Sequence, residues 1–375
     1  MRLLISCYEP KGYGGAATIA YEMCRAFQQM GVEAGYLNII SDFDADYFRF
    51  KYGANFANPE KLGNVFTSFV DSEQYSTPQL AVISGVAKFK PDVILACGYI
   101  AALALKISVP EIPLVYLTTG CKQAQIYLQK DEDLDAISLY SDLLNLDWPP
   151  KIYDHDEKQA SELADLIITH SDQTKQFYHA FFSQVEGKIH NRVFWLAHGI
   201  IRHVRKYQAS SKPFFNRNID LLFVSSDWCR TEKNYPFVAA IAAGLPDANI
   251  HIVGEIPYAI TGVSNHATIP DFKTLYELMG NSKTIVSPSR LDPAPGILFE
   301  GAVMGCNIVA SRNCGNWRLC NPNLVVEDFT PQHFIEKIKT SLTDKLPDGL
   351  AEIEAATDIA ELLELLKLAA SIEWD

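Results

Sequence analysis

The stretch TIVSPSRLDPAPGILFEGAVMGCNIVASRNCGNW, residues 284–317, decides the fold of this chain. Its pattern predicts a short β-branched strand over 284–286 and a loop over 287–295 that contains three prolines. A helix is predicted from Gly296, and Gly305 stands where a left-handed residue ends a helix. A second buried strand is predicted over 306–310. The stretch therefore predicts a strand–loop–helix–strand unit of an α/β protein.

The start of this helix has the character of an anion site. A helix that begins behind a parallel strand presents unpaired backbone N–H groups and the positive end of its dipole. Asp292 and Glu300 flank the start and, eight positions apart, are not expected to share one helical face. Carboxylates beside an anion site commonly bind hydroxyl groups. The pattern therefore predicts a binding site for a nucleotide sugar, whose diphosphate lies at the helix end, whose ribose lies at one acid and whose hexose lies at the other.

The same segment resembles the carboxylate-x7-carboxylate signature of retaining GT-B glycosyltransferases, in particular family 4, which includes bacterial polysaccharide and envelope enzymes. The first acid of that signature is usually Glu, and here it is Asp292. The resemblance implies that Glu300 binds the ribose diol and that Asp292 binds hydroxyls of the transferred sugar. It also implies backbone contacts with the sugar and diphosphate from Pro295, Gly296, Ile297 and Leu298. An isolated pair of such acids would more often be a turn residue and a solvated helix residue, and it is the surrounding strand–loop–helix–strand pattern that favours a binding site.

Composition limits the other possibilities. The chain has 375 residues, enough for two domains, and 32 Lys and Arg against 45 Asp and Glu give a net charge of −13. This negative net charge argues against a protein that binds the phosphate backbone of a nucleic acid. No apolar run approaches the roughly 18 residues of a membrane span and no signal peptide is seen, so we expect a cytoplasmic protein. Eight cysteines without a C-x-x-C and nine histidines without an H-E-x-x-H predict reduced thiols and no metal.

The first half of the chain alternates strand and helix signals, which is the doubly wound pattern. A glycine-rich turn follows the first strand (2–7), and the resemblance implies that Gly14 and Gly15 face the donor diphosphate. A tight turn alone is the alternative for this pair. After the strand at 114–117 the family commonly has a His against the donor sugar, and this chain has Thr119 and Gly120 there.

Three further segments are interpreted from composition. The aromatic segment 41–78 is either a packed excursion that covers the sheet or a loop that contacts the acceptor or a membrane surface. Residues 121–146 are predicted as one long helical segment. A strand over 193–196 and a turn at 198–200 are expected to close the first domain, and the basic, aperiodic segment 202–217 is interpreted as a linker.

The second domain is predicted to begin with a buried parallel strand over 220–225. The loop that follows, 226–234, resembles the family's Gly-Arg…Lys-Gly loop, whose Arg and Lys clamp the diphosphate. Lys233 matches the Lys, and Arg230 is the candidate Arg at a shifted position. Two cations here would offset the charge of a departing diphosphate without a metal. Gly254 matches the family's turn under the nucleotide base.

Together these features predict an α/β protein with the GT-B fold, in which two Rossmann-like domains with mostly parallel sheets face a central cleft. The predicted parts are an acceptor-side domain (1–201), the linker (202–217), a donor nucleotide-sugar domain (218–345) and C-terminal helices that cross back (346–375). The predicted enzyme is a retaining hexosyltransferase that uses a nucleotide-diphosphate sugar, with a UDP-sugar favoured, and neither cofactor nor metal.

The predicted acceptor is a glycan, a lipid-linked molecule or a small molecule, in polysaccharide or glycoconjugate synthesis. The second predicted location, besides the cytoplasm, is the inner face of the membrane, with the protein bound peripherally. The alternative function is a catalytically inactive GT-B protein that binds a sugar nucleotide or a glycan. A glycosidase with Asp292 and Glu300 as acid and nucleophile is disfavoured, because one acid precedes the helix and the other lies inside it.

Overall fold

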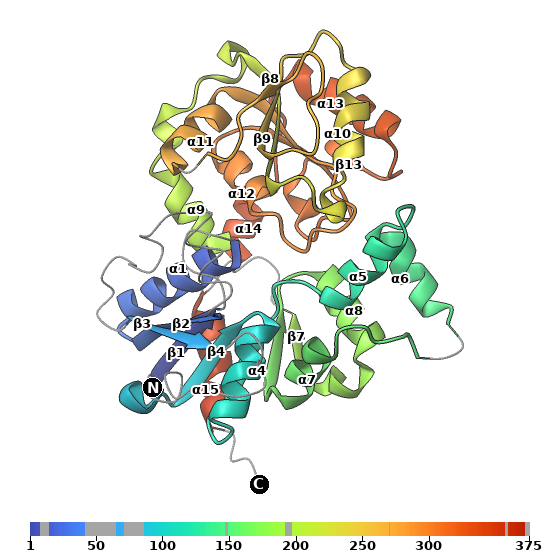
Figure 1. Ribbon diagram of the computed structural model, residues 1–375. Helices are drawn as coiled ribbons and strands as arrows, with labels where there is room; N and C mark the ends of the chain where they lie inside the picture. Colours follow the sequence, from blue (N-terminus) through green and yellow to red (C-terminus); the bar gives the residue numbers. More distant parts are fainter. Residues whose placement is uncertain are drawn as a thin grey trace. The chain divides into compact units, whose positions relative to one another are not determined.

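The computed structural model describes residues 1–7, 15–41, 65–70, 86–146, 149–191, 197–269, 271–356 and 359–371. It is an α/β structure with two parallel sheets, and the chain divides into two compact units (Figure 1). Unit 1 comprises Met1–Gln123, Pro149–Gly199 and Asp358–Asp375, and unit 2 comprises Ala124–Trp148 and Ile200–Thr357. The fold class predicted from the sequence is confirmed.

Unit 1 is built on a seven-stranded sheet in the order β3-β2-β1-β4-β5-β6-β7. The strands are β1 (Arg2–Cys7), β2 (Glu33–Ser41), β3 (Val65–Val70), β4 (Val93–Cys97), β5 (Leu114–Leu117), β6 (Leu166–Thr169) and β7 (Ile189–Asn191). The helices include α1 (Gly15–Gln29), α4 (Tyr99–Ser108), α7 (His155–Leu163), α8 (Asp172–Phe181) and, from the end of the chain, α15 (Ile359–Ser371).

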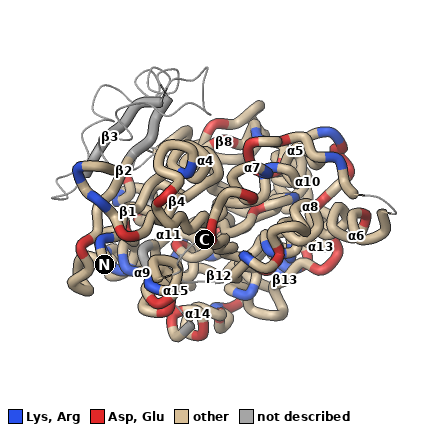
Figure 2. Tube along the Cα trace, turned by 90° about the horizontal axis from the view of Figure 1, so that it is seen from below, with Lys and Arg blue, Asp and Glu red and all other residues tan. Residues whose placement is uncertain are grey.

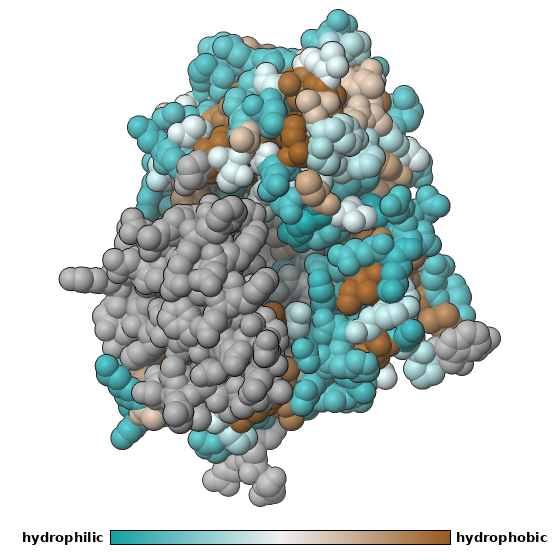
Figure 3. All heavy atoms as spheres, in the orientation of Figure 1, coloured by the Kyte–Doolittle hydropathy of each residue, from teal (hydrophilic) through white to brown (hydrophobic). Residues whose placement is uncertain are grey.

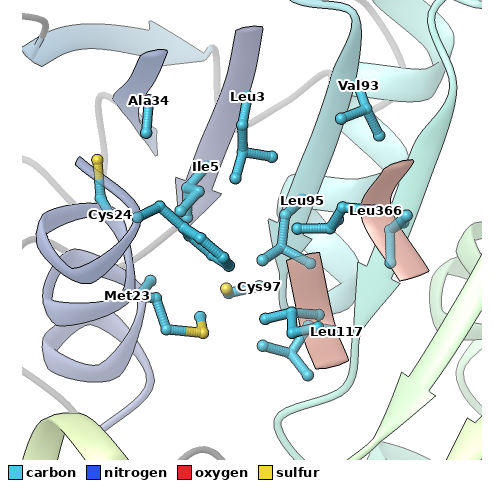
Figure 4. Close-up of a cluster of buried hydrophobic side chains, with 14 of the residues drawn as sticks. Leu3, Ile5, Met23, Cys24, Ala34, Val93, Leu95, Cys97, Leu117 and Leu366 are labelled. Carbon is cyan, nitrogen blue, oxygen red and sulfur yellow. The ribbon is translucent and has the colours of Figure 1, made fainter. Parts of the chain in front are cut away.

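The core of unit 1 joins both ends of the chain. Side chains of β1, β4 and β5 pack with those of α1 and α15 in one buried cluster, and Figure 4 shows Leu366 beside Leu95 and Leu117. Leu95 and Leu366 are completely buried. The apolar face of α15 thus completes a sheet whose first strand begins at residue 2.

Unit 2 is built on a six-stranded parallel sheet in the order β10-β9-β8-β11-β12-β13. The strands are β8 (Ile219–Asp227), β9 (Ile250–Glu255), β10 (Ser264–Asn265), β11 (Ser282–Ser287), β12 (Asn307–Ser311) and β13 (Val325–Val326). The helices are α5 (Lys122–Lys130), α6 (Ala136–Leu144), α9 (Ala197–Arg205), α10 (Tyr235–Ala243), α11 (Phe272–Gly280), α12 (Gly296–Val303), α13 (Pro331–Thr343) and α14 (Leu350–Ala356). Unit 2 includes α5 from residue 124 and α9 from residue 200.

The stretch 284–317 folds as predicted. β11 pairs in parallel with β8 and β12, α12 begins at Gly296, and Gly305 has a φ of 76°. A Cβ atom at Gly301 would lie 2.6 Å from the side chain of Ile285, so α12 lies directly on β11 because this residue has no side chain. The contact fixes which face of α12 turns toward the sheet.

The long helical segment predicted over 121–146 is two helices. α5 ends at Lys130 and α6 begins at Ala136, with the acidic residues Asp131, Glu132 and Asp133 in the turn. Asp135 caps α6, since its Oδ1 accepts from the backbone N–H of Ser138 at 2.8 Å. Asp side chains compete with the helical backbone and favour caps and turns, which explains the break.

The segment interpreted as a turn and linker is also different in the structure. Residues 197–205 form α9, whose Ile201 and Val204 are buried. Arg205 pairs with Glu354 on α14, and Arg217 is 6% exposed. The apolar residues among the basic ones therefore bury one face, and this segment belongs to unit 2 from residue 200. The predicted strand over 193–196 lies outside the described residues, as does most of 41–78.

Charge and hydropathy are mixed over the surface. Figure 2 shows Lys and Arg interspersed with Asp and Glu along the described chain, and Figure 3 shows small hydrophobic patches among hydrophilic residues on one face. Within the described ranges, every helix is too short or too polar to cross a bilayer. Contact with a membrane surface stays a prediction.

We expect Arg217→Met to lower the free energy of unfolding by about 2–4 kcal/mol. The guanidinium donates to the carbonyl oxygens of Lys212 (2.9 Å), Ser282 (2.7 Å) and Met304 (2.9 Å), and the substitution removes all three of these hydrogen bonds at once. Urea denaturation followed by circular dichroism measures the loss. Arg312→Met is the control, because Arg312 forms an exposed ion pair with Glu327 whose loss costs below about 1 kcal/mol. Equal losses for the two variants would show that Arg217 does not hold this region together.

Candidate functional site

The carboxyl edge of the unit 2 sheet brings three loops together. In a parallel sheet the segments after the strands meet at this edge, which is where ligands bind in open α/β folds. Arg290 donates its backbone N–H to the carbonyl oxygen of Glu232 at 2.8 Å, joining the loops after β11 and β8. Asp292 donates its N–H to the carbonyl oxygen of Asn313 at 3.0 Å, which joins the loop after β12. Residues far apart in the sequence therefore share one scaffold.

Lys233 and Asp292 form an ion pair in this scaffold. Lys233 ends the short 3-10 turn Thr231–Lys233, and its Nζ lies 2.5 Å from Oδ2 of Asp292. Asp292 is 8% exposed, and its carbonyl oxygen accepts from Gly315 at 2.8 Å, so its backbone is bonded on both sides. Two candidate site residues that are 59 positions apart thus meet as one charge pair.

Arg230 lies in the same charge cluster. Its guanidinium pairs with the carboxylate of Glu232, and its Nε donates to Oε1 at 2.8 Å. Burial lowers the pKa of Arg230, but the charges of Glu232 and Asp292 outweigh it, so the net shift is upward. Arg230 therefore stays cationic in a cluster with Lys233 and Asp292. Glu232, which is 5% exposed, is a member of this cluster that sequence reasoning did not include.

Helix α12 is labelled in Figure 1, and its first turn presents backbone donors that have no acceptor among the described residues. Pro295 is the N-cap and has no side-chain acceptor to offer. Among the described residues, no acceptor takes the N–H of Gly296 or Ile297. Asn316, which sequence reasoning missed, donates its Nδ2 to the carbonyl oxygen of Pro295 at 2.9 Å and fixes the start of the helix. An anion is the partner that such a helix start favours.

Glu300 lies one turn into α12, beside α11. It is half-buried, and burial raises the pKa of its carboxyl to about 7. Its charge in turn helps burial to raise the pKa of Tyr276 on α11. Within the part of the chain that the structure describes, the Glu300 carboxylate has neither an ion pair nor a hydrogen-bond donor. A partly buried carboxylate without a donor is suited to bind hydroxyl groups of a ligand.

The remaining predicted site residues fall into two groups. Gly254, the last residue but one of β9, has a φ of 119°, and a Cβ atom there would lie 1.7 Å from the carbonyl oxygen of Ser225, so this position requires glycine. Gly15, Thr119 and Gly120 belong to unit 1, at the start of α1 and after β5, and Gly14 lies outside the described residues. Their contact with a donor stays a prediction.

In the ranges that the structure describes, no three His, Cys, Asp or Glu side chains are grouped so that they could hold a metal ion. A reaction without a metal stays a prediction.

Comparison with known proteins identifies the fold. No family model matches the sequence, and no curated protein matches it. Among solved structures, HepE from Anabaena, in complex with UDP and glucose, has a TM-score of 0.62 at 13% identity, over 99% of this chain and 100% of that one. Sucrose-phosphate synthase from Thermosynechococcus elongatus gives 0.62 at 14%, over 99% and 96%. The catalytic domain of starch synthase IV from Arabidopsis thaliana, bound to ADP and acarbose, gives 0.61 at 11%, over 99% and 100%.

These similarities define the class of structure. The chain has the two-sheet GT-B fold of these proteins along nearly its whole length. At identities of 11–14% the likeness extends to the fold, and the chemistry has to be argued from the site.

The raised pKa of Glu300 predicts a pH-dependent stability difference between the wild type and Glu300→Gln. The folded state holds the proton of Glu300 more tightly than the unfolded state, so stability from this group is present below pH 4.5 and is lost as the pH rises to about 7. We expect the unfolding free energy of the wild type, relative to the variant, to fall by about 1–2 kcal/mol between pH 5 and pH 8. Urea titrations at both pH values measure it, and a constant difference would contradict the burial of this carboxyl.

Proposed function

We propose that this protein is a retaining glycosyltransferase that transfers a hexose from a nucleotide-diphosphate sugar, with a UDP-sugar favoured, to a glycan, lipid-linked or small-molecule acceptor. One observation carries the proposal. In the chain, Gly296 and Ile297, whose N–H groups have no acceptor among the described residues, stand between two acids: Asp292, which is paired with Lys233, and Glu300, which has no donor among those residues. This set matches the anion, the sugar hydroxyls and the ribose diol of a nucleotide sugar.

Each group has a separate part in the proposed reaction. The start of α12 binds the diphosphate, and Glu300 accepts hydrogen bonds from the ribose diol. Asp292 accepts from hydroxyls of the sugar and orients its anomeric carbon. Lys233 and Arg230 stabilise the negative charge that grows on the leaving phosphate, as preorganised cations do in a site with little water.

The reaction proceeds on one face of the sugar. The bond from the anomeric carbon to the phosphate oxygen breaks as the bond to the acceptor oxygen forms, and the departing phosphate takes the acceptor proton. The products are a nucleoside diphosphate and a glycoside with retained configuration. A protein nucleophile is not needed, and the two cations serve where a metal would otherwise offset the charge.

The preference for UDP is supported by HepE, which was crystallised with UDP and glucose, while starch synthase IV was crystallised with ADP. The inactive binding protein is the second candidate. It is favoured by the pairing of Asp292 with Lys233, which occupies the shorter acid. Consumption of the donor separates the two functions.

Glu300→Gln is expected to weaken nucleotide binding by about 1–3 kcal/mol, because the ribose diol loses a charged acceptor. Thermal stabilisation by UDP, GDP, ADP and TDP, with and without a chelator, identifies the base and tests the metal-free site. Titration calorimetry with the best nucleotide then gives the affinity. Glu277→Gln is the matched control, since Glu277 lies on α11 and faces solvent. If Glu300→Gln binds like the wild type, the ribose assignment is wrong.

Asp292→Asn is expected to leave binding of the free nucleoside diphosphate within about twofold of the wild type and to reduce transfer roughly 10²-fold, because it removes the charge that orients the sugar. Nucleotide release from screened UDP-sugars and acceptors measures the rate. Asp220→Asn is the control, since Asp220 pairs with Lys283 at 2.8 Å at the start of β8. Loss of nucleotide binding together with transfer would contradict the division of roles. A wild type that binds the nucleotide but consumes no donor would favour the binding protein.

A further inference from the structure

Arg290 lies two residues before Asp292 and reaches a distant part of the chain. Its side chain is buried, at 5% exposure for the residue. Nε donates to the carbonyl oxygen of Leu134 at 2.6 Å, and Nη2 donates to that of Asp131 at 2.5 Å. Both carbonyl groups belong to the turn between α5 and α6, more than 150 positions earlier. One guanidinium thus holds this turn against the loop after β11.

The backbone around Arg290 strengthens the same junction. Its carbonyl oxygen accepts from the N–H of Ala136 at 2.9 Å, and its own N–H donates to Glu232 at 2.8 Å. The next N–H of α6, from Ile137, donates to Oδ1 of Asn313 at 3.1 Å. Asn313 is the residue whose carbonyl oxygen accepts from Asp292. The α5–α6 turn is therefore bonded to the loops that carry Lys233 and Asp292.

Charge explains why a guanidinium occupies this position. Burial lowers the pKa of Arg290, while the carboxylates of the turn, at Asp131, Asp135, Glu132 and Asp133, act in the opposite direction. The cation is satisfied by carbonyl oxygens and by this acidic turn. A Lys ammonium is a point charge without the planar fork that reaches two carbonyl groups in fixed directions.

We propose that Arg290 is a positioning residue for sugar transfer, which docks the α5–α6 turn onto the loop after β11 and so fixes the carboxylate of Asp292. The inference rests on the proposed function. It makes residues 131–137 part of the site without contact with the substrate. Arg290 acts on Asp292 and leaves the nucleotide-binding groups of α12 in place.

Arg290→Gln and Arg290→Lys test the inference. We expect kcat to fall about 10–100-fold, as displacement of a site group by around 1 Å can do, while the dissociation constant for UDP stays within about twofold. Arg312→Lys is the control, because its guanidinium pairs with Glu327 at the surface of the same unit. Unchanged kcat in both Arg290 variants would overturn the inference. Loss of UDP binding and thermal stability along with kcat would also overturn it, by assigning Arg290 to general stability.

A double-mutant cycle separates action through Asp292 from independent action. If Arg290 works by holding Asp292, Arg290→Gln should cause little further loss of kcat in the Asp292→Asn background. Multiplicative losses would overturn the positioning role. A wild type that consumes no donor overturns the proposed function and the inference with it, whereas an active wild type in which the two losses of kcat multiply overturns the inference alone.

Ala136→Pro examines the junction from its other side. Ala136 is the first residue of α6, where proline is favoured, and Asp135 before it is extended, with φ of −120° and ψ of 176°. The substitution keeps the helix and removes the N–H that bonds to Arg290. We expect a loss of kcat with unchanged UDP binding. His155→Pro, at the first position of α7 after the cap Asp154, is the matched control and should keep wild-type kcat. Equal kcat for both proline variants would contradict the docking role.

Discussion

The ion pair between Lys233 and Asp292 is the interaction on which the candidate site depends. A pair with little exposure carries a desolvation cost that mutual attraction alone does not reliably offset. Here the backbone of Asp292 is bonded to Asn313 and Gly315, so the carboxylate is held in place by the loop after β12 as well as by Lys233. Under the proposed function, this geometry would let a donor sugar replace the ammonium as the partner of Asp292 without a rearrangement of the loop.

The part of the fold that was predicted from the sequence rests on local determinants. The β-branched strand, the prolines before α12 and the left-handed Gly305 each impose a backbone conformation regardless of distant contacts. These signals predicted the start of α12 at Gly296, between the acids Asp292 and Glu300. The alternation of strands and helices along the chain predicted both sheets.

The parts that were missed depend on contacts between distant residues. Arg290 and Leu134 are 156 positions apart, and the sequence around each residue contains no signal that predicts their contact. Asn316 likewise shows its role through the carbonyl oxygen of Pro295. The break between α5 and α6 was accessible in principle, since the run from Asp131 to Asp135 is rich in residues that cap helices. The buried face of α9 was obscured by the basic residues around Ile201 and Val204.

Among the residues that the structure describes, Glu157 and Glu300 have a carboxyl pKa that burial raises to about 7, and their surroundings differ. Glu157 accepts from the backbone N–H groups of Lys122 (2.8 Å) and Gln123 (2.9 Å) and from the hydroxyl of Tyr178 (3.2 Å), so it already serves the start of α5. Glu300 has no such donors among the described residues. A raised pKa alone does not distinguish the two carboxyls. The donors around Glu157 assign it to structure, and the lack of donors at Glu300 is what supports the proposal that it binds a ligand.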